Sequence, residues 1–241
     1  METLVLYADD DLLAVNKPAG LPTLPDGYNP DLPHVKSVLE PQFGRLWIVH
    51  RLDRYTSGVL LLARSAAAHR ELNRQFAASL VGKTYRALSQ GAPDWQTHRV
   101  ELPLRADGDH RHRTVVDPVK GKLAETELAV LEVFVGYTWI EARPHTGRTH
   151  QVRAHLAAAG LPLVGDELYG GEALYLSQLK PGFRPQQGKE CPIVSRPALH
   201  AWVLAFAHPS SGMAMTFSAP LPNDLRAGLK QLRRYRPCTE G

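Results

Sequence analysis

A single carboxylate stands in a strongly cationic motif, HRLDRYTSG, at residues 50–58 of this 241-residue sequence. Asp53 has Arg51 and Arg54 on either side, and apolar runs enclose the motif at both ends. These runs predict strands, and a loop held between strands can keep a catalytic group rigidly in place. The neighbouring guanidiniums favour the ionised form of the carboxylate. We therefore expect an active site here, with an anionic Asp53 in a cationic frame that suits a polyanion.

A second charged cluster, RPHTGRTHQVRAH, occupies residues 143–155. It predicts a strand, a turn and then a helix over residues 150–159 that Thr149 caps. His150 and Arg153 are three residues apart, so they share the face of this helix near its N-terminus, where free backbone N–H groups attract anions. Such a junction can bind a phosphate or a protein carboxylate, or it can hold an ion pair that only orders the core.

The histidines form no metal-binding pattern. His150 and His155 are five residues apart, whereas a zinc-binding helix spaces its two histidines by four. Arginines flank His110 and His112 and would repel a cation. We therefore expect no metal site.

His50, Asp53 and Ser57 lie within eight residues, which raises the alternative of a hydrolytic triad. A triad needs its base between the acid and the nucleophile in space, and the GxSxG motif is absent. The motif also lacks the second carboxylate that ordinary glycoside hydrolysis requires. The pattern favours one carboxylate in a nucleophilic or electrostatic role, without metal or cofactor.

The composition is that of an ordinary globular chain, with 44% hydrophobic and 22% charged residues. There is neither an 18-residue apolar run nor a signal-peptide pattern, which predicts a cytoplasmic protein away from membranes. Cys191 and Cys238 form no CxxC pair and indicate neither a disulfide framework nor zinc. Residues 1–40 carry a net charge of −5, and the total of +4 leaves +9 for residues 41–241, which favours a polyanionic partner.

The apolar patterns predict the elements that position these motifs. Ser65 is expected to cap a helix that runs to about residue 79, with an apolar residue at every fourth position from Ala68 to Leu80. The predicted strands lie at residues 4–7, 12–16, 83–88, 126–135, 137–142, 199–207 and 213–218. The first two strands are expected to form a hairpin, as are the strands at 126–135 and 137–142, which are joined near Gly136. Because strands outnumber helices and mostly follow one another, we expect an α+β fold with a largely antiparallel sheet. It would form one domain over residues 1–241, with a core at about 5–220 and a basic segment at 223–241.

Tyr85 follows Lys83 and Thr84 in one of these predicted strands. A tyrosine in this position is ordinarily a half-buried sheet residue. Beside a cationic cleft it can instead stack a nucleobase, which is worth about 1–3 kcal/mol per base. The sequence leaves both interpretations open.

These motifs, in this order, resemble those of the RluA-type RNA pseudouridine synthases. The matches run from about residue 5 to residue 220. Six motifs carry the resemblance: NKPAG at 16–20, HRLD with TSG at 50–58, KTY at 83–85, TGRTHQVR at 146–153 with His155, GD at 165–166 with Tyr169, and LHA at 199–201 with HP at 208–209.

The resemblance implies roles for individual residues. Asp53 would be the catalytic aspartate, Tyr85 the ring stacked on the target uracil, and Arg153 the arginine paired with Asp53. The residues expected to bind the substrate are Arg51, which would fill the gap left by the extracted base, and Lys17, Arg148 and His150. No cofactor is implied.

The reaction implied is the isomerisation of specific uridines to pseudouridine in ribosomal or transfer RNA. The nucleotide is flipped out, the N1–C1′ bond breaks, the uracil turns and a C5–C1′ bond forms. The carboxylate either attacks C1′ or removes a proton from C2′, and the sequence leaves both routes open. The alternative function is a non-catalytic RNA-binding or RNA-folding module.

The resemblance also implies a mixed, mostly antiparallel sheet that bends around an RNA-binding cleft, with flanking helices. Many family members carry an S4-type RNA-binding domain first, whereas here the catalytic pattern starts within ten residues. We therefore expect a member without an S4 domain, acting as a monomer with no obligate protein partner. Target choice would rest on the charged loop at residues 105–123 and on the tail after Asn223.

Overall fold

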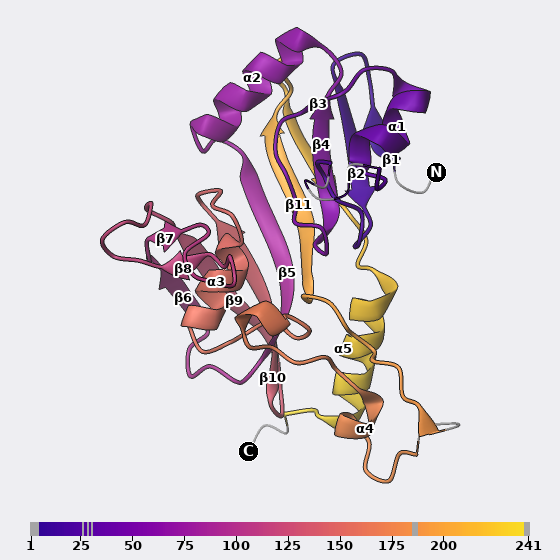
Figure 1. The fold of residues 1–241 in the computed structure, drawn as a ribbon, viewed down its shortest axis with the longest axis vertical. Coiled ribbons are helices and arrows are strands. Elements are labelled where there is room, and N and C mark those ends of the chain that lie inside the picture. The colour runs from indigo at the N-terminus through magenta and orange to yellow at the C-terminus, as the bar shows by residue number, and fades with distance from the viewer. Residues whose placement is uncertain (1–4, 26, 28, 30, 185–187, 239–241) are drawn as a thin grey trace. The chain divides into compact units, whose positions relative to one another are not determined.

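The computed structural model describes residues 5–25, 27, 29, 31–184 and 188–238 of the chain. Its helices and mostly antiparallel strands confirm the predicted α+β class (Figure 1). Two compact units divide the chain: unit 1 consists of Met1–Thr84 and His200–Pro220, and unit 2 of Tyr85–Leu199 and Leu221–Gly241. The RNA-binding cleft and the single catalytic domain stay predictions.

The strands of unit 1 pair mostly antiparallel. They are β1 (Val5–Ala8), β2 (Leu12–Lys17), β3 (Trp47–Ile48), β4 (Ser57–Ala63), β11 (Leu199–Ala207) and β12 (Ala214–Ser218). β2 pairs with β1 and β4, β3 with β4, and β12 with β11, all antiparallel, whereas β11 runs parallel to β4. The predicted N-terminal hairpin is therefore confirmed. Every residue of β4 is buried, as expected for a strand covered on both faces.

Helix α2 (Ala66–Ala77) forms where the sequence predicted it. The Ser65 Oγ accepts the Ala68 N–H at 3.0 Å, which satisfies one of the free donors of the first turn. Ala68 and Leu72 are buried against the strands of unit 1. Leu80, which continues this apolar spacing, lies past the end of the helix and is 60% exposed.

Helix α1 (Val35–Phe43) was not predicted. It follows a segment rich in proline and glycine, and it contains Pro41. Val35 and Leu39 bury one face of the helix in unit 1. Tertiary burial therefore stabilises a helix for which the local sequence carries weak signals.

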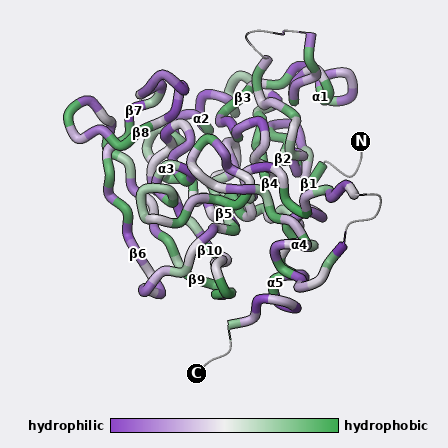
Figure 2. The backbone as a smooth tube through the Cα atoms, turned by 60° about the horizontal axis from the view of Figure 1, so that its bottom comes forward, coloured by the Kyte–Doolittle hydropathy of each residue, from purple (hydrophilic) through white to green (hydrophobic). Residues whose placement is uncertain are grey.

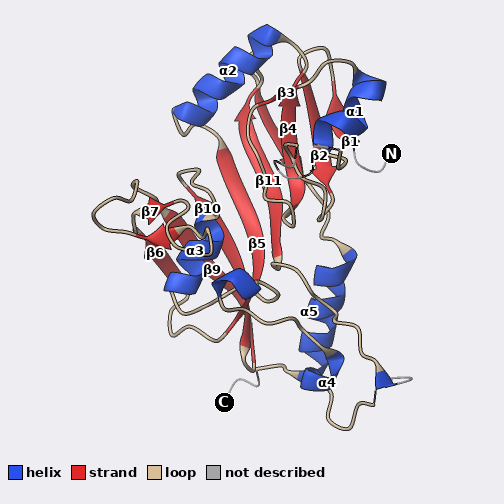
Figure 3. Cartoon of the chain, viewed as in Figure 1, coloured by secondary structure: helices blue, strands red, loops and turns tan. Residues whose placement is uncertain are grey.

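The main sheet of unit 2 is formed by β5 (Gly82–Gln90), β6 (Thr97–Val100), β9 (Thr126–Phe134) and β10 (Tyr137–Pro144). β10 pairs antiparallel with β5 and β9, and β9 with β6 (Figure 3). The predicted hairpin near Gly136, which has φ of 83°, is confirmed. Within the predicted loop at residues 105–123, β7 (Leu104–Arg105) and β8 (Val115–Val116) form a separate two-stranded sheet.

The described residues of unit 2 also form the helices α3 (Gln151–Ala158), α4 (Leu176–Leu179) and α5 (Asn223–Tyr235) and the short 3-10 helix η2 (Glu167–Tyr169). Ala87 and Ile140 pack with residues of α3, whereas their chain neighbours Leu88 and Trp139 pack with residues of α5. Successive side chains of a strand point to opposite faces. α3 and α5 therefore cover opposite faces of this sheet.

The basic C-terminal segment forms α5. Leu225, Leu229 and Leu232 are buried. Figure 2 shows this periodicity as alternating green and purple along the helix. Arg233 forms an ion pair with Glu132 of β9 at 2.7 Å. One of the arginines proposed to face a polyanion is thus engaged within the protein. No helix in the described parts of the chain has the length and hydropathy to cross a membrane.

We predict that Ser65→Ala lowers the free energy of unfolding by about 1 kcal/mol, because the Ala68 N–H loses its cap. Urea denaturation followed by circular dichroism measures this change. Ser65→Asn is the matched control and should retain most of the stability, since asparagine caps helices as well as serine does. Equal unfolding midpoints for Ser65→Ala and the native chain would contradict the capping role.

Candidate active site

The loop that carries Asp53 is fixed through its backbone. The buried Thr23 hydroxyl donates to the Leu52 carbonyl oxygen at 2.8 Å and accepts the Leu52 N–H at 3.2 Å. On the other side, the Asp53 carbonyl accepts the Thr56 N–H at 3.1 Å, closing a turn. The residue before Asp53 and the turn after it are both held. This is the rigid support that a catalytic carboxylate needs.

Lys17 lies buried under the same loop, with 1% of its surface exposed. Its Nζ donates to the carbonyl oxygens of Pro18 at 2.9 Å, Leu21 at 2.8 Å and Arg54 at 3.1 Å. Gly20 and Arg54 add two bonds between the same loops. The sequence predicted a substrate contact for Lys17. The structure corrects this, because the ammonium is removed from solvent and organises backbone carbonyls.

His50, the first residue of the motif, supports β4. Its Nε2 accepts the Leu61 N–H at 3.0 Å, and its ring stacks on Phe76 with centroids 4.8 Å apart. Desolvation, with a smaller contribution from the charge of Lys83, lowers the pKa of His50 to about 3. The imidazole is therefore neutral at physiological pH and serves as a hydrogen-bond acceptor within the fold.

Ser57 and His200 form a buried pair. The Ser57 Oγ lies 2.9 Å from His200 Nδ1, and His200 Nε2 lies 3.1 Å from the Ala219 carbonyl oxygen. A carbonyl can only accept, so Nε2 carries the proton and Nδ1 accepts from the serine hydroxyl. Ser57 is 3% exposed and His200 is 0% exposed. This pair connects β4 to β11, which agrees with Ser57 as a structural residue and not as a nucleophile.

Gly58 lies where β11 approaches β4. Its φ is 117°, and a Cβ at this position would come within 2.1 Å of the Ala201 carbonyl oxygen. No other residue fits without moving one of the strands. The glycine of the TSG motif is therefore required by the parallel pairing of these strands.

In unit 2, Arg153 is 8% exposed and forms a two-pronged ion pair with Asp166. Its Nε donates to Oδ2 at 2.7 Å and its Nη2 to Oδ1 at 2.8 Å. The guanidinium also lies over the Tyr169 ring, 4.9 Å from the centroid. A guanidinium has five N–H donors, so the fork to Asp166 is compatible with a second carboxylate partner. Pairing with Asp53 stays a prediction.

Tyr169 connects Arg153 to the start of α3. Its hydroxyl accepts the Thr114 N–H at 3.0 Å, donates to the Thr114 carbonyl at 3.2 Å, and lies 3.1 Å from His150 Nδ1. Burial raises the pKa of Tyr169, so its hydroxyl stays protonated at neutral pH. Arg153, His150 and Tyr169 thus form one connected group in unit 2.

The predicted cap of α3 was wrong. His150, not Thr149, is the N-cap residue, and its φ of 50° is left-handed. The turn before the helix is held by the Gln151 side chain instead, whose Oε1 accepts the Thr146 hydroxyl at 2.7 Å and the Arg148 N–H at 3.0 Å. The other end of this amide, Nε2, donates to the Glu125 carbonyl at 2.8 Å. Gln151 therefore gives the TGRTHQVR motif its shape.

Tyr85 lies on the face of the unit 2 sheet that is covered by α3, the helix that carries Arg153. Tyr85 pairs with Ala142 of β10 and packs with the cluster that contains the apolar residues of α3. Its side chain is half-buried. Arg86, the next residue, points to the opposite face, where it forms an ion pair with Glu141.

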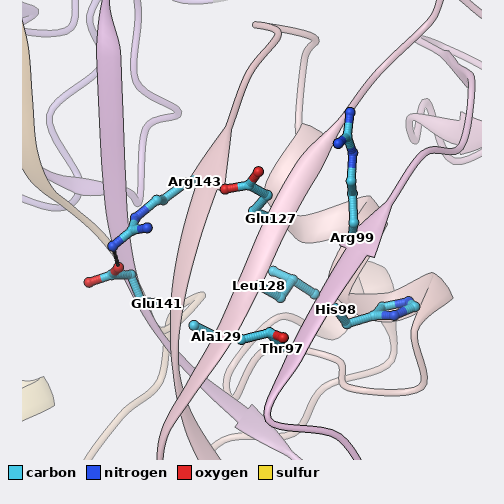
Figure 4. A pocket seen from close by; sticks show the side chains of 8 residues that line it. All are labelled: Thr97, His98, Arg99, Glu127, Leu128, Ala129, Glu141 and Arg143. Atoms are coloured by element: carbon cyan, nitrogen blue, oxygen red, sulfur yellow. Dashed lines mark ion pairs between the residues drawn. The ribbon is translucent and has the colours of Figure 1, made fainter.

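A pocket of about 270 Å³ lies on that opposite face (Figure 4). Glu141 and Arg143 form an ion pair within it. Its lining residues are Thr97, His98, Arg99, Glu127, Leu128, Ala129, Glu141 and Arg143. None of these was predicted as a site residue, and the pocket is separate from the face that carries Tyr85.

One group among the described residues has metal-ligand composition: Glu125, Glu127 and His145. The His145 Nε2 lies 3.2 Å from Glu127 and 3.7 Å from Glu125. Arg99 already pairs with Glu125 at 2.8 Å, so a cation would have to compete with a guanidinium. This group therefore gives no support for a metal centre.

The exposed members of the predicted site are Arg51 and Arg148. The Arg148 Nε donates to the Leu123 carbonyl at 3.0 Å. Sequence reasoning missed Asp166 and Thr23 as supports of the site. Asp166 belongs to the GD motif and was noted there. Its pairing with Arg153 could not be predicted, because the two residues are 13 positions apart and lie on different elements. Thr23 lies in a loop rich in proline and glycine and had no signal.

Known proteins share both the sequence and the fold. The family model for RNA pseudouridylate synthase matches residues 11–158. RNA pseudouridine synthase 2, chloroplastic, of Oryza sativa subsp. japonica is 36% identical over 220 residues, which cover 86% of this chain and 49% of the rice protein. The chain thus spans about half the length of that relative.

Two further comparisons cover more of the related protein. Ribosomal large subunit pseudouridine synthase D of Zymomonas mobilis subsp. mobilis is 36% identical over 238 residues, covering 95% of this chain and 72% of the relative. The solved structure of human RNA pseudouridylate synthase domain containing 4 is 25% identical, with a TM-score of 0.75, and the match covers 95% of this chain and 92% of the human chain. The matched region includes Asp53, Tyr85 and Arg153. The chain belongs to the RNA pseudouridylate synthase family.

Proposed function

We propose that this chain is an isomerase that converts uridine to pseudouridine in RNA, with Asp53 as its catalytic carboxylate. The observation that carries the proposal is that hydrogen bonds of Leu52 and Thr56 fix the backbone on both sides of Asp53. This loop lies in the region that the family model matches. An ionised carboxylate can attack C1′ or remove a proton from C2′. Both routes need a carboxylate held in one place, and the hydrogen bonds that fix the backbone on both sides of Asp53 support such a role.

Tyr85 and Arg153 are proposed to complete the catalytic group. A half-buried tyrosine ring can stack on the uracil while it turns. Arg153 would balance the charge of Asp53, and Asp166 would act as a positioning residue that fixes its guanidinium plane. The proposal requires Asp53 of unit 1 to act on the same nucleotide as the two residues of unit 2.

Base flipping costs a few kcal/mol for a stacked nucleotide. We assign part of its compensation to Arg51, whose exposed side chain would occupy the gap left by the base. Arg148 and His150, at the start of α3, are proposed as further RNA contacts. The net charge of +9 over residues 41–241 supports a polyanionic substrate.

The proposed substrates are ribosomal and transfer RNA. The Zymomonas relative is named for the large ribosomal subunit, which favours ribosomal RNA. We further propose that the chain acts as a monomer in the cytoplasm, without a cofactor.

Asp53→Asn should abolish product formation while leaving the fold intact, because the amide has the same shape but no anionic oxygen. The expected loss is about 10²–10⁴-fold or more, the range for a positioned catalytic group. Tritium release from RNA labelled at uracil C5 measures turnover, and filter binding measures RNA affinity.

Asp10→Asn, at an exposed position of the same unit, is the control and should behave as the native chain. Full activity of Asp53→Asn would refute the role of this carboxylate. RNA binding by the native chain without any pseudouridine would instead indicate a non-catalytic RNA-binding module.

Arg153→Met should reduce turnover far more than RNA affinity, because the charge next to the reacting group is lost while most phosphate contacts remain. Single-turnover rates and binding constants, measured on the same RNA, separate the two effects. Arg153→Lys should not restore the rate, since an ammonium cannot form the two-pronged pair. Equal losses of rate and affinity would show that Arg153 is mainly a phosphate contact.

Asp166→Asn should lower the turnover rate with little change in RNA affinity, because Arg153 loses its charged partner.

In a double-mutant cycle of Asp166→Asn with Arg153→Met, the changes in the free energy of unfolding should be non-additive by about 0.5–3 kcal/mol. Urea denaturation of the four proteins measures this coupling. Strict additivity would mean that the two side chains do not stabilise one another.

A further inference from the structure

Within the described parts of the chain, the turn at residues 116–123 carries the two most exposed large hydrophobic residues. Val119 is 88% exposed and Leu123 is 81% exposed. Lys120 and Lys122 lie between them and are also exposed. Two aliphatic side chains this open to solvent on one short turn, with two lysines between them in the sequence, indicate a binding surface.

This turn is held in a fixed shape. The Asp117 Oδ1 accepts the N–H groups of Val119 at 3.0 Å and Lys120 at 2.9 Å, while its Oδ2 accepts the Arg105 Nε at 2.6 Å. Lys122 exchanges two backbone bonds with Leu104, at 2.8 and 2.9 Å. The exposed side chains are therefore presented by a preorganised backbone, which lowers the entropy lost on binding.

Gly121 lets the turn lie directly against the backbone of Pro103 and Leu104. A Cβ there would come within 2.3 Å of the Asp117 carbonyl oxygen and 2.8 Å of the Pro103 carbonyl carbon. Its own N–H donates to the Asp117 carbonyl at 2.8 Å. The sequence VKGKL at 119–123 thus combines a close backbone contact with outward-facing side chains.

Contacts within unit 2 attach this turn to the helix that carries Arg153. Leu104 and Ala124, which flank the charged loop at residues 105–123, pack with Ala154 of α3 and with Tyr169. The Leu123 carbonyl accepts the Arg148 guanidinium. The other basic segment, α5, covers the opposite face of the sheet. Of the two basic segments, the turn is the one joined to the proposed catalytic residues.

We propose that residues 116–123 bind the RNA that flanks the target uridine. Lys120 and Lys122 contact phosphates, and Val119 and Leu123 pack on unstacked bases. RNA loops offer apolar base faces next to a charged backbone, which matches the alternation of aliphatic and cationic side chains in this turn. This inference rests on the proposed function and assigns substrate selection to this turn.

Two double variants test the contact: Val119→Ser with Leu123→Ser, and Lys120→Gln with Lys122→Gln. The matched controls are Leu131→Ser with Val135→Ser, at exposed apolar positions, and Lys180→Gln with Lys189→Gln, at exposed cationic positions outside both basic segments. Affinity for transcribed bacterial large-subunit ribosomal RNA and for total transfer RNA is measured over a salt series. Tritium release from the same RNAs is measured in parallel.

The lysine variant should lower the salt dependence of binding by roughly one unit of slope per lysine removed. The Val119 and Leu123 variant should bind about fivefold more weakly, because the apolar surface that the two side chains bury against bases is lost, with an unchanged slope. Both control variants should match the native chain. If both test variants also match it while pseudouridine still forms, the contact does not exist.

A photo-crosslinking amino acid in place of Val119 gives a readout that is independent of activity. Crosslinks to RNA, close to the modified uridine, support the proposal, and crosslinks to protein alone overturn it. If the native chain makes no pseudouridine in either RNA, the proposed catalysis fails. RNA binding that depends on residues 119–123 would still support the contact in that case.

Discussion

A buried ammonium group organises the two loops on which the proposed chemistry depends. Removing a cation from water costs several kcal/mol, and Lys17 is compensated by carbonyl oxygens from Pro18, Leu21 and Arg54. Because Arg54 directly follows Asp53, the position of the carboxylate is linked to the NKPAG turn. The Thr23 hydroxyl adds a second support through Leu52. The Lys17 ammonium and the Thr23 hydroxyl together fix the backbone on the two sides of the proposed catalytic group.

Unit 2 positions its cation by a comparable device. Arg153 has its plane set by the fork to Asp166 and by the ring of Tyr169 beneath it. Tyr169 is in turn bonded to Thr114, just before β8. A change in the 104–124 segment can therefore reach Arg153 through one tyrosine. This connection joins the proposed RNA-binding turn to the proposed catalytic arginine through hydrogen bonds and a ring contact of Tyr169.

Elements with strong local signals were predictable from the sequence. Ser65 followed by an apolar stripe identified α2, and Gly136 between two alternating runs identified the β9–β10 hairpin. The sequence did not indicate α1, because its local signals are weak and the burial of Val35 and Leu39 depends on the rest of unit 1. It also placed the cap of α3 one residue early, since the left-handed His150 depends on bonds from Gln151 to a distant strand.

For the site, the residue types were predictable and their environments were not. Asp53, Tyr85 and Arg153 stood out by motif, yet nothing local distinguished a buried Lys17 from a substrate-binding one. The Arg153–Asp166 pair joins a helix to a turn beyond its end, so helical periodicity carried no sign of it. Burial and long-range pairing are properties of the folded chain, and these are what the sequence patterns omit.

The parallel pairing of β4 with β11 has a consequence for how the protein is made. Ser57 bonds to His200, 143 residues further along the chain. At about 5–20 residues per second, a ribosome needs roughly 7–30 s to synthesise that interval. During this time β4 lacks its parallel neighbour β11. The contacts of Lys17 and Thr23 with the loop of the proposed catalytic Asp53 can therefore form before β11 completes the sheet beside β4.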